Sequence, residues 1–353
     1  MRVVVAMSGG VDSSVSALRL KEAGHDVVGV FLRNGVTEPR ARGRGHGCCG
    51  VADALDAEEV AGLLGIPFYA LDESAAFERI VAGFVGAYAR GETPNPCVEC
   101  NRELKFGELL RFAKALGAEG LATGHYARCE ARGDAVVLRR ARDRAKDQSY
   151  VLATVAPAAL KRAHFPVGEL TKEEVRDTAR RAGLPVHAKP ESQEICFVPT
   201  GDYRDLLRER RPDLFRAGPV RDGSGALVGE HGGVAGFTVG QRKGLGVAFG
   251  APRYVVATDA ATNIVVVGER RELLRQRCRL RDARWFASAA GGGGGRSLQV
   301  RAHHEPVGLA DLALVDDGAE LTISPPGEAI TPGQIGVVYE GERVLGAGLL
   351  SIA

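Results

Sequence analysis

The chain has 353 residues, which is too long for one compact core, so two or three domains are expected. Hydrophobic residues make up 45% and charged residues 25%, as in ordinary globular proteins, and no segment approaches the roughly 18 consecutive apolar residues of a membrane span. The formal net charge of only +2 argues against a globally basic nucleic-acid binder. The N-terminus shows no signal-peptide pattern, and a cytoplasmic location without membrane attachment is expected.

The first half of the chain alternates short apolar runs with helical patterns. Residues 3–7 form a continuous apolar run typical of a strand buried on both faces, and the helical spacing that follows ends at Gly24. The alternation predicts an α/β fold with a doubly wound parallel sheet. Further strands are expected at 26–32, 66–71 and 120–127, and further helices at 52–65, 75–89, 102–117 and 171–185. Thr171 and Glu174 fit a capping box at the start of the last of these helices.

The character of the sequence changes beyond about residue 200. Residues 225–259 are rich in Gly, Val and turn signals, which predicts a small β-rich domain. The segments 278–286, 297–307 and 319–350 have the alternation of a barrel-like β domain. We therefore expect an α/β catalytic domain at 1–199, a small central β-rich domain at 200–268 and a C-terminal β-barrel at 269–353.

The stretch "AMSGGVDSS" (6–14) lies between the first strand and the first helix, which is where α/β folds bind phosphates. Gly9 and Gly10 allow close approach of the backbone, and Ser8 and Ser13 supply hydroxyls. The loop is not a Walker A motif, because no Gly-Lys-Ser/Thr follows. Asp12 would repel a phosphate unless it binds Mg²⁺ or supports the loop.

Seven cysteines show no disulfide-scaffold spacing, and the close pairs indicate metal binding or catalysis. Cys97 and Cys100 form a Cys-x-x-Cys pair before an expected helix, whose N-terminus would lower the pKa of the Cys100 thiol. The pair alone is compatible with half a zinc site, a redox centre, iron–sulfur ligands or one reactive thiol. Zinc would need four ligands, and the adjacent Cys48 and Cys49 are poorly suited to complete such a site.

The phosphate loop resembles the PP-loop of the ATP pyrophosphatase superfamily, which implies cleavage of ATP between its α and β phosphates and adenylation of a substrate oxygen. With six further stretches the chain resembles the bacterial tRNA 2-thiouridylase (MnmA/TrmU) family. These stretches are "TPNPCVECNRELKF" (93–106), "ATGHYAR" (122–128), "KDQSYVL" (146–152), "SQEICF" (192–197), "FTVGQRKGL" (237–245) and "TPGQIGVVY" (331–339).

The resemblance implies an enzyme that converts the wobble uridine of tRNA to 2-thiouridine. It implies catalytic roles for Cys100 and for Cys196 as a persulfide carrier, and we predict that adenylation needs Asp12. ATP would contact Ala6, Met7, Ser8, Gly9, Gly10, Val11, Asp12, Ser13, Leu32 and Gly124. The tRNA would contact Asn95, Pro96, Cys97, His125, Lys146, Asp147, Gln148, Arg301 and Gln334. His125 could equally be a satisfied histidine at a strand end, and residues 146–148 a solvated turn.

The resemblance also implies partners and cofactors: tRNAs reading Lys, Glu and Gln codons, a cysteine desulfurase or sulfur-relay protein as donor, ATP and Mg²⁺. Many relatives carry Asp at position 97. Because this chain has a third thiol there, we predict a [4Fe–4S] cluster on Cys97, Cys100 and Cys196. The competing interpretation is a persulfide and disulfide relay. Two other functions stay open, a PP-loop ligase for a small molecule and a tRNA-binding protein with a silent ATP loop.

Overall fold

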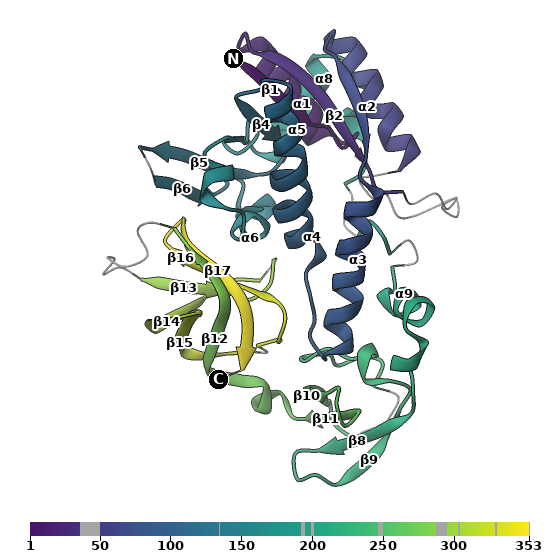
Figure 1. Ribbon diagram of the computed structural model, residues 1–353. Coiled ribbons are helices and arrows are strands. Elements are labelled where there is room, and N and C mark those ends of the chain that lie inside the picture. Colours follow the sequence, from purple (N-terminus) through teal and green to yellow (C-terminus); the bar gives the residue numbers. More distant parts are fainter. Residues whose placement is uncertain are drawn as a thin grey trace.

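The computed structural model describes residues 1–35, 50–133, 135–191, 195–198, 201–245, 250–286, 295–302, 304–328 and 330–352. Cys48, Cys49 and residues 192–194 of the "SQEICF" stretch lie outside these ranges. An α/β domain carries the N-terminus, a β-barrel lies beside it, and a small central sheet lies at the far end of α3 (Figure 1). Within the described ranges, no helix is long and apolar enough to cross a membrane.

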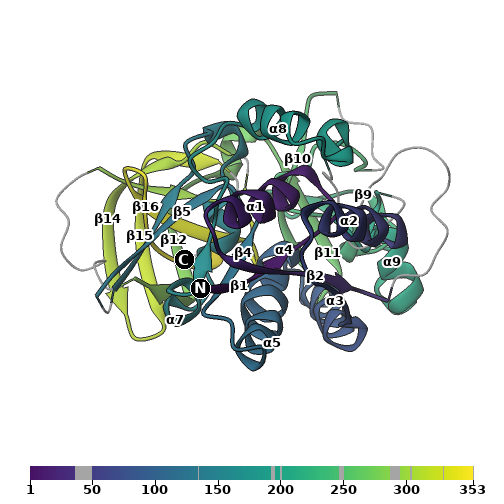
Figure 2. The same cartoon turned by 90° about the horizontal axis from the view of Figure 1, so that it is seen from above.

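The α/β domain is built on five parallel strands in the order β3-β2-β1-β4-β7. The continuous apolar runs of β1 and β2 are buried, since helices cover both faces of the sheet. Helices α1, α2 and α8 lie on one face, and α3 and α5 on the other (Figure 2). The predicted doubly wound parallel sheet is therefore confirmed. The strands are β1 Arg2–Ala6, β2 Asp26–Arg33, β3 Phe68–Asp72, β4 Gly120–Thr123 and β7 Ala163–His164.

The helices begin where local sequence signals place them. Thr171 and Glu174 form the expected capping box at the start of α8, with reciprocal hydrogen bonds of 3.2 and 2.7 Å. One boundary differs from expectation, because the helical segment after Asn95 begins at Pro96 and continues as a π-helix from Cys100. The α-helices of this domain are α1 Val11–Glu22, α2 Val51–Leu64, α3 Ser74–Ala89, α4 Pro96–Glu99, α5 Leu110–Ala115, α6 Ser149–Leu152, α7 Pro157–Leu160 and α8 Lys172–Arg181, with the π-helix at Cys100–Leu109 and 3₁₀ turns at Arg144–Lys146 and Pro185–Ala188.

The central domain holds a sheet in the order β10-β11-β8-β9, preceded by a helix that the Gly-rich pattern did not predict. Its elements are α9 Tyr203–Arg210, β8 Gly218–Asp222, β9 Leu227–His231, β10 Tyr254–Asp259 and β11 Ile264–Gly268, with 3₁₀ turns at Pro212–Leu214, Val234–Gly236 and Arg270–Leu273.

Six strands form the C-terminal barrel, which closes because β12 pairs with both β15 and β17. The predicted barrel is therefore confirmed. A hairpin of the α/β domain, β5–β6, continues this sheet by pairing with β17. The strands are β5 Ala127–Arg132, β6 Ala135–Arg140, β12 Leu274–Trp285, β13 Arg296–Gln299, β14 Val307–Val315, β15 Gly318–Glu328, β16 Ile335–Glu340 and β17 Arg343–Ile352.

The barrel and the α/β domain share one hydrophobic core. Val337, Tyr339 and Val344 of the barrel belong to the same buried cluster as Val4 and Leu121 of the parallel sheet. Removing the barrel would therefore expose apolar surface of the α/β domain, and the two domains fold as one body in this region.

A buried ion pair lies in this shared core. Arg140 and Asp147 are 3.1 Å apart, and their side chains are only 7% and 5% exposed. The Arg140 guanidinium lies 3.6 Å from the centre of the Tyr339 ring, and Ser149 Oγ donates to Asp147 Oδ2 at 2.8 Å. The Asp147 carboxylate is therefore used inside the fold, because a buried arginine needs a charged partner. The expected contact of Asp147 with tRNA stays a prediction.

We predict that Asp147→Ala lowers the free energy of unfolding by about 3–5 kcal/mol, because it leaves the Arg140 guanidinium buried without a counter-ion. Urea unfolding followed by circular dichroism measures the loss. Glu130→Ala is the matched control, since Glu130 pairs with the exposed Arg132 on the surface. The control should leave the urea midpoint unchanged. An Asp147→Ala protein with a wild-type midpoint would contradict this account of the core.

Candidate active site

The phosphate loop follows β1 at the carboxyl edge of the parallel sheet. Gly9 adopts a φ of +69°, and a side chain there would overlap the backbone carbonyl of Asp53. The Ser13 hydroxyl accepts a hydrogen bond from the Ser8 N–H at 3.1 Å and donates to the Gly10 carbonyl at 3.1 Å. The loop is thus braced internally before α1 begins at Val11, with the positive end of the helix at the loop.

The other expected ATP contacts lie at the same edge. Val30 of β2 pairs with Ala6 of β1, so Leu32 extends two residues beyond the point where β1 ends. Gly124 follows β4, and a Cβ built there would lie 2.6 Å from the Ser13 backbone nitrogen. Three of the expected contact residues are buried, so they can offer ATP their backbone rather than their side chains: Met7, Val11 and Ser13. Four others are partly exposed: Ala6, Ser8, Gly10 and Asp12.

Asp12 is the centre of a charged network that the sequence did not reveal. Lys172, the first residue of α8, donates to both carboxylate oxygens of Asp12 at 2.8 Å. Tyr126 donates its hydroxyl to Asp12 at 2.8 Å. Glu191 lies 3.0 Å from Lys172 and 2.7 Å from Lys146. These partners are 114 and more residues from Asp12 in the chain, so no local motif could have indicated them.

The network has a definite charge state at neutral pH. Burial and then the neighbouring Asp12 carboxylate raise the pKa of Tyr126, so its hydroxyl stays protonated and donates. Burial opposes ionisation of Glu191, but hydrogen bonds from Lys146 and Lys172 outweigh it and lower the pKa of that carboxyl. Two carboxylates and two ammonium groups therefore alternate beside the phosphate loop.

A second lysine braces the loop from behind. Lys189 Nζ donates to the Gly9 carbonyl at 2.9 Å and to Asp53 at 2.8 Å, and it also pairs with Asp56. Hydrogen bonds to these carboxylates overcome the effect of burial and raise the pKa of Lys189, so it remains charged. Sequence reasoning missed this residue as well, because its partners lie on α2.

The structure separates the residues expected to bind tRNA. His125 is 7% exposed and its Nδ1 lies 2.6 Å from the Thr123 hydroxyl. Burial, and then the charge of Lys105, hold the pKa of His125 well below its usual value, so the ring is neutral. In this structure His125 is a satisfied histidine at a strand end, and its expected contact with tRNA stays a prediction. Gln148 accepts from the Tyr126 N–H at 3.0 Å, next to the network.

Cys97, Cys100 and Cys196 occupy different environments. Asn95 caps the helix that begins at Pro96 by accepting from the Cys97 N–H at 3.1 Å, and the Cys97 residue is exposed. Cys100 lies one turn further along the helix rather than at its start, and both Cys100 and Cys196 pack against one hydrophobic cluster. Within the described ranges, no three His, Cys, Asp or Glu side chains are arranged to hold a metal ion. The [4Fe–4S] cluster on these three cysteines therefore stays a prediction.

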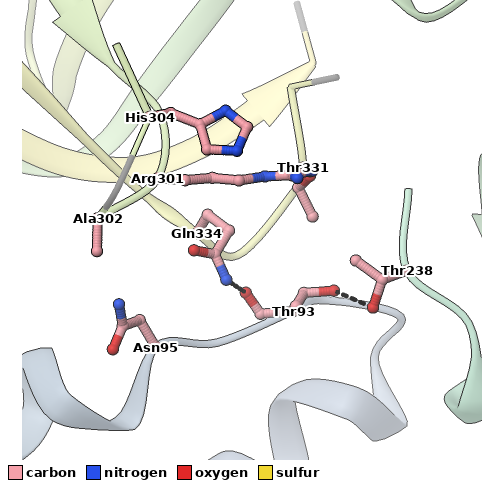
Figure 3. Close-up of a pocket in the computed structure, with 8 residues that line it drawn as sticks. All are labelled: Thr93, Asn95, Thr238, Arg301, Ala302, His304, Thr331 and Gln334. Atoms are coloured by element: carbon pink, nitrogen blue, oxygen red, sulfur yellow. Dashed lines mark hydrogen bonds between the residues drawn. The ribbon is translucent and has the colours of Figure 1, made fainter. Parts of the chain in front are cut away.

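A cavity of about 350 Å³ lies where the three domains meet, close to the start of α4 (Figure 3). Gln334 donates to the Thr93 carbonyl at 2.9 Å, and Thr93 contacts Thr238 of the central domain. Arg301 reaches across to Thr331 at 3.0 Å. The expected tRNA contacts Asn95, Arg301 and Gln334 are thus brought together. The lining residues are Thr93, Asn95, Thr238, Arg301, Ala302, His304, Thr331 and Gln334.

A phosphate loop at the carboxyl edge of a doubly wound parallel sheet is the geometry of a nucleotide-binding α/β protein. Family models match nearly the whole length of the chain: a tRNA methyl transferase HUP domain at 1–200, a tRNA methyl transferase PRC-barrel domain at 204–269 and an aminomethyltransferase beta-barrel domain at 275–350.

Three curated relatives, each named "tRNA-specific 2-thiouridylase MnmA", match over nearly all of both chains. The protein of Chloroflexus aggregans is 46% identical over 99% of this chain and 98% of its own. The protein of Geobacter metallireducens is 44% identical over 100% of this chain and 97% of its own. The protein of Mycolicibacterium paratuberculosis is 45% identical over 99% of this chain and 99% of its own. The chain belongs to the tRNA-specific 2-thiouridylase (MnmA) family, as the motifs predicted.

The contact of Gly124 with α1 generates a prediction about ATP binding. Gly124→Ala should weaken ATP binding by about tenfold, or about 1.4 kcal/mol, because the added methyl group displaces the start of α1. Isothermal titration calorimetry measures the change. Gly83→Ala is the control, since a methyl group there meets nothing within 4 Å on the exposed side of α3. Unchanged ATP affinity in a folded Gly124→Ala protein would show that the contact does not position the loop.

Proposed function

We propose that the chain catalyses ATP-dependent 2-thiolation of tRNA, at the wobble uridine. The observation that carries this proposal is full-length family membership combined with a braced PP-loop, a thiol at Cys100 and a second thiol at Cys196. Both thiols pack against the same cluster on the domain that carries the loop. An ATP site and two thiols in one domain are what replacement of a carbonyl oxygen by sulfur requires.

The first half-reaction activates the base. The C2 oxygen of uridine attacks the α-phosphorus of ATP, the bond to the β-phosphate breaks, and pyrophosphate leaves. The phosphate loop and the positive end of α1 stabilise the negative charge that develops on the phosphates. Mg²⁺ takes one or two protein carboxylates together with phosphate oxygens, and Asp12, which is partly exposed at the loop, is the carboxylate that would hold it. When bound it would neutralise phosphate charge.

The second half-reaction replaces the activated oxygen. The terminal sulfur of a persulfide on Cys196 attacks C2, and AMP leaves with the former C2 oxygen. The Cys100 thiolate then attacks the Cys196 sulfur, which forms a Cys100–Cys196 disulfide and releases 2-thiouridine. An external dithiol must reduce this disulfide, and a sulfur donor must restore the persulfide. The relay needs two thiols, and Cys97 has no role in it.

The tRNA would lie over the cavity at the junction of the three domains. Asn95, Pro96 and Cys97 would lie next to the target base, and Arg301 and Gln334 would contact the RNA from the barrel. Lys146 and Gln148 would contact it from the loop before α6. The family resemblance supports three further parts of the proposal. The substrates would be tRNAs reading Lys, Glu and Gln codons, the sulfur donor a cysteine desulfurase or relay protein, and the location the cytoplasm.

Mass spectrometry of nucleosides from the tRNA, with ATP and a sulfur donor supplied, tests the proposal. We expect 2-thiouridine with the wild-type chain and a loss of at least about a hundredfold in Asp12→Ala, Cys100→Ser and Cys196→Ser. Cys97→Ser is the matched control, since serine keeps the size of the side chain beside the base and removes only a thiol from the same helix, and it should keep its rate within about twofold.

Two results would contradict the relay. Full activity of Cys100→Ser or Cys196→Ser would show that the substituted thiol takes no part in sulfur transfer. Loss of activity in Cys97→Ser, together with dependence on iron in anaerobically prepared protein, would favour the three-cysteine cluster. Absence of 2-thiouridine with the wild-type chain, but formation of AMP from ATP with a small-molecule acceptor, would indicate a ligase instead.

A further inference from the structure

We propose that Lys172 is a phosphate-binding residue of the ATP site, positioned by Asp12 and Glu191 so that its ammonium group meets the β- and γ-phosphates. This inference rests on the proposed use of ATP and adds a residue outside the loop motif to the site. Three observations support it: the position of Lys172, its charge, and the contacts that Asp12 and Glu191 keep when the Lys172 ammonium group turns toward a phosphate.

The position comes from two helices on one face of the sheet. Lys172 is the first residue of α8, which lies beside α1 (Figure 2), and its Nζ is 2.8 Å from both oxygens of Asp12 in the first turn of α1. The backbone N–H of Lys172 donates to Asp143 at 3.0 Å, which fixes the start of α8. The Lys172 side chain is only 12% exposed, so its ammonium group is held at the loop rather than extended into water.

Charge gives the reason for a lysine at this point. The first turn of α1 attracts an anion, but Asp12 places a negative charge there, and its side chain is 30% exposed. A triphosphate entering the loop would meet this carboxylate unless a cation stood beside it. Lys172 supplies that cation, and an ammonium group with three donors can contact a phosphate while it remains next to Asp12.

The remaining contacts allow Lys172 to turn toward a phosphate without leaving a carboxylate unpartnered. Glu191 has a second cation, Lys146, at 2.7 Å. Asp12 keeps the hydrogen bond from the Tyr126 hydroxyl at 2.8 Å. By contrast, Lys189 donates to the Gly9 carbonyl and pairs with two carboxylates of α2, so it supports the loop from behind. Lys172 is therefore the lysine of this region that is suited to move.

An acyl-phosphate derivative of ATP tests the position directly. A lysine amine near the γ-phosphate attacks the acyl carbon, an amide forms, and ATP is released. We expect peptide mass spectrometry of the wild-type protein to find the acyl group on Lys172, and excess ATP to prevent its transfer. ATP-protected labelling of Lys146 or Lys189 without labelling of Lys172 would overturn the inference.

Calorimetric titration with ATP tests the energetic contribution. Lys172→Met should raise the Kd for ATP at least about tenfold, whereas Lys172→Arg, which keeps the charge, should stay within about threefold. Lys114→Met is the control, because Lys114 is exposed on α5 at the opposite face of the sheet. A Lys172→Met Kd within twofold of wild type would overturn the inference. If the wild-type protein neither binds ATP nor is labelled, the proposed function itself fails.

Discussion

A carboxylate at the mouth of an anion-binding loop has to be neutralised before the loop can accept a phosphate, and in this chain that carboxylate is Asp12. Lys172, at the start of α8, neutralises this carboxylate, and Tyr126, between β4 and β5, orients it with a hydrogen bond. The contact with Lys172 spans 160 residues of sequence. The phosphate loop is local in sequence, but its electrostatic balance depends on α8 and β4 being folded against α1.

The same network extends toward the barrel. Lys146 pairs with Glu191 beside the phosphate loop, and the next residue, Asp147, pairs with Arg140 under the Tyr339 ring of β16. Two adjacent residues of one loop thus link the phosphate-loop network to the core that the barrel shares with the parallel sheet.

Cys97, Cys100 and Cys196 differ in what surrounds them. Cys97 is exposed to water, while Cys100 and Cys196 both pack against the apolar cluster that contains Phe197. An apolar environment protects a persulfide from water and from stray thiols, which suits a relay between two of the three sulfurs. The Cys-x-x-Cys spacing alone could not distinguish these environments, because both residues lie on one helix.

The sequence by itself determined the parallel sheet, the phosphate loop, the capping box of α8 and the family, because each depends on residues close together in the chain or on a motif matched as a block. Strand and helix periodicity are local properties, and they predicted β1, β2 and α1 well. The sequence did not predict that the helix starts at Pro96. A proline can occupy the first position of a helix or stand in a loop before one, and the sequence alone does not distinguish the two.

Only the tertiary structure decided which charged residues meet. His125 and Asp147 resembled RNA contacts in the linear motifs, yet one is buried against Thr123 and the other against Arg140. Lys172 and Glu191 carried no signal at all. Ion pairs form between segments that the fold brings together, and their burial depends on the packing of the barrel against the parallel sheet. Neither property is encoded in the spacing of residues along the chain.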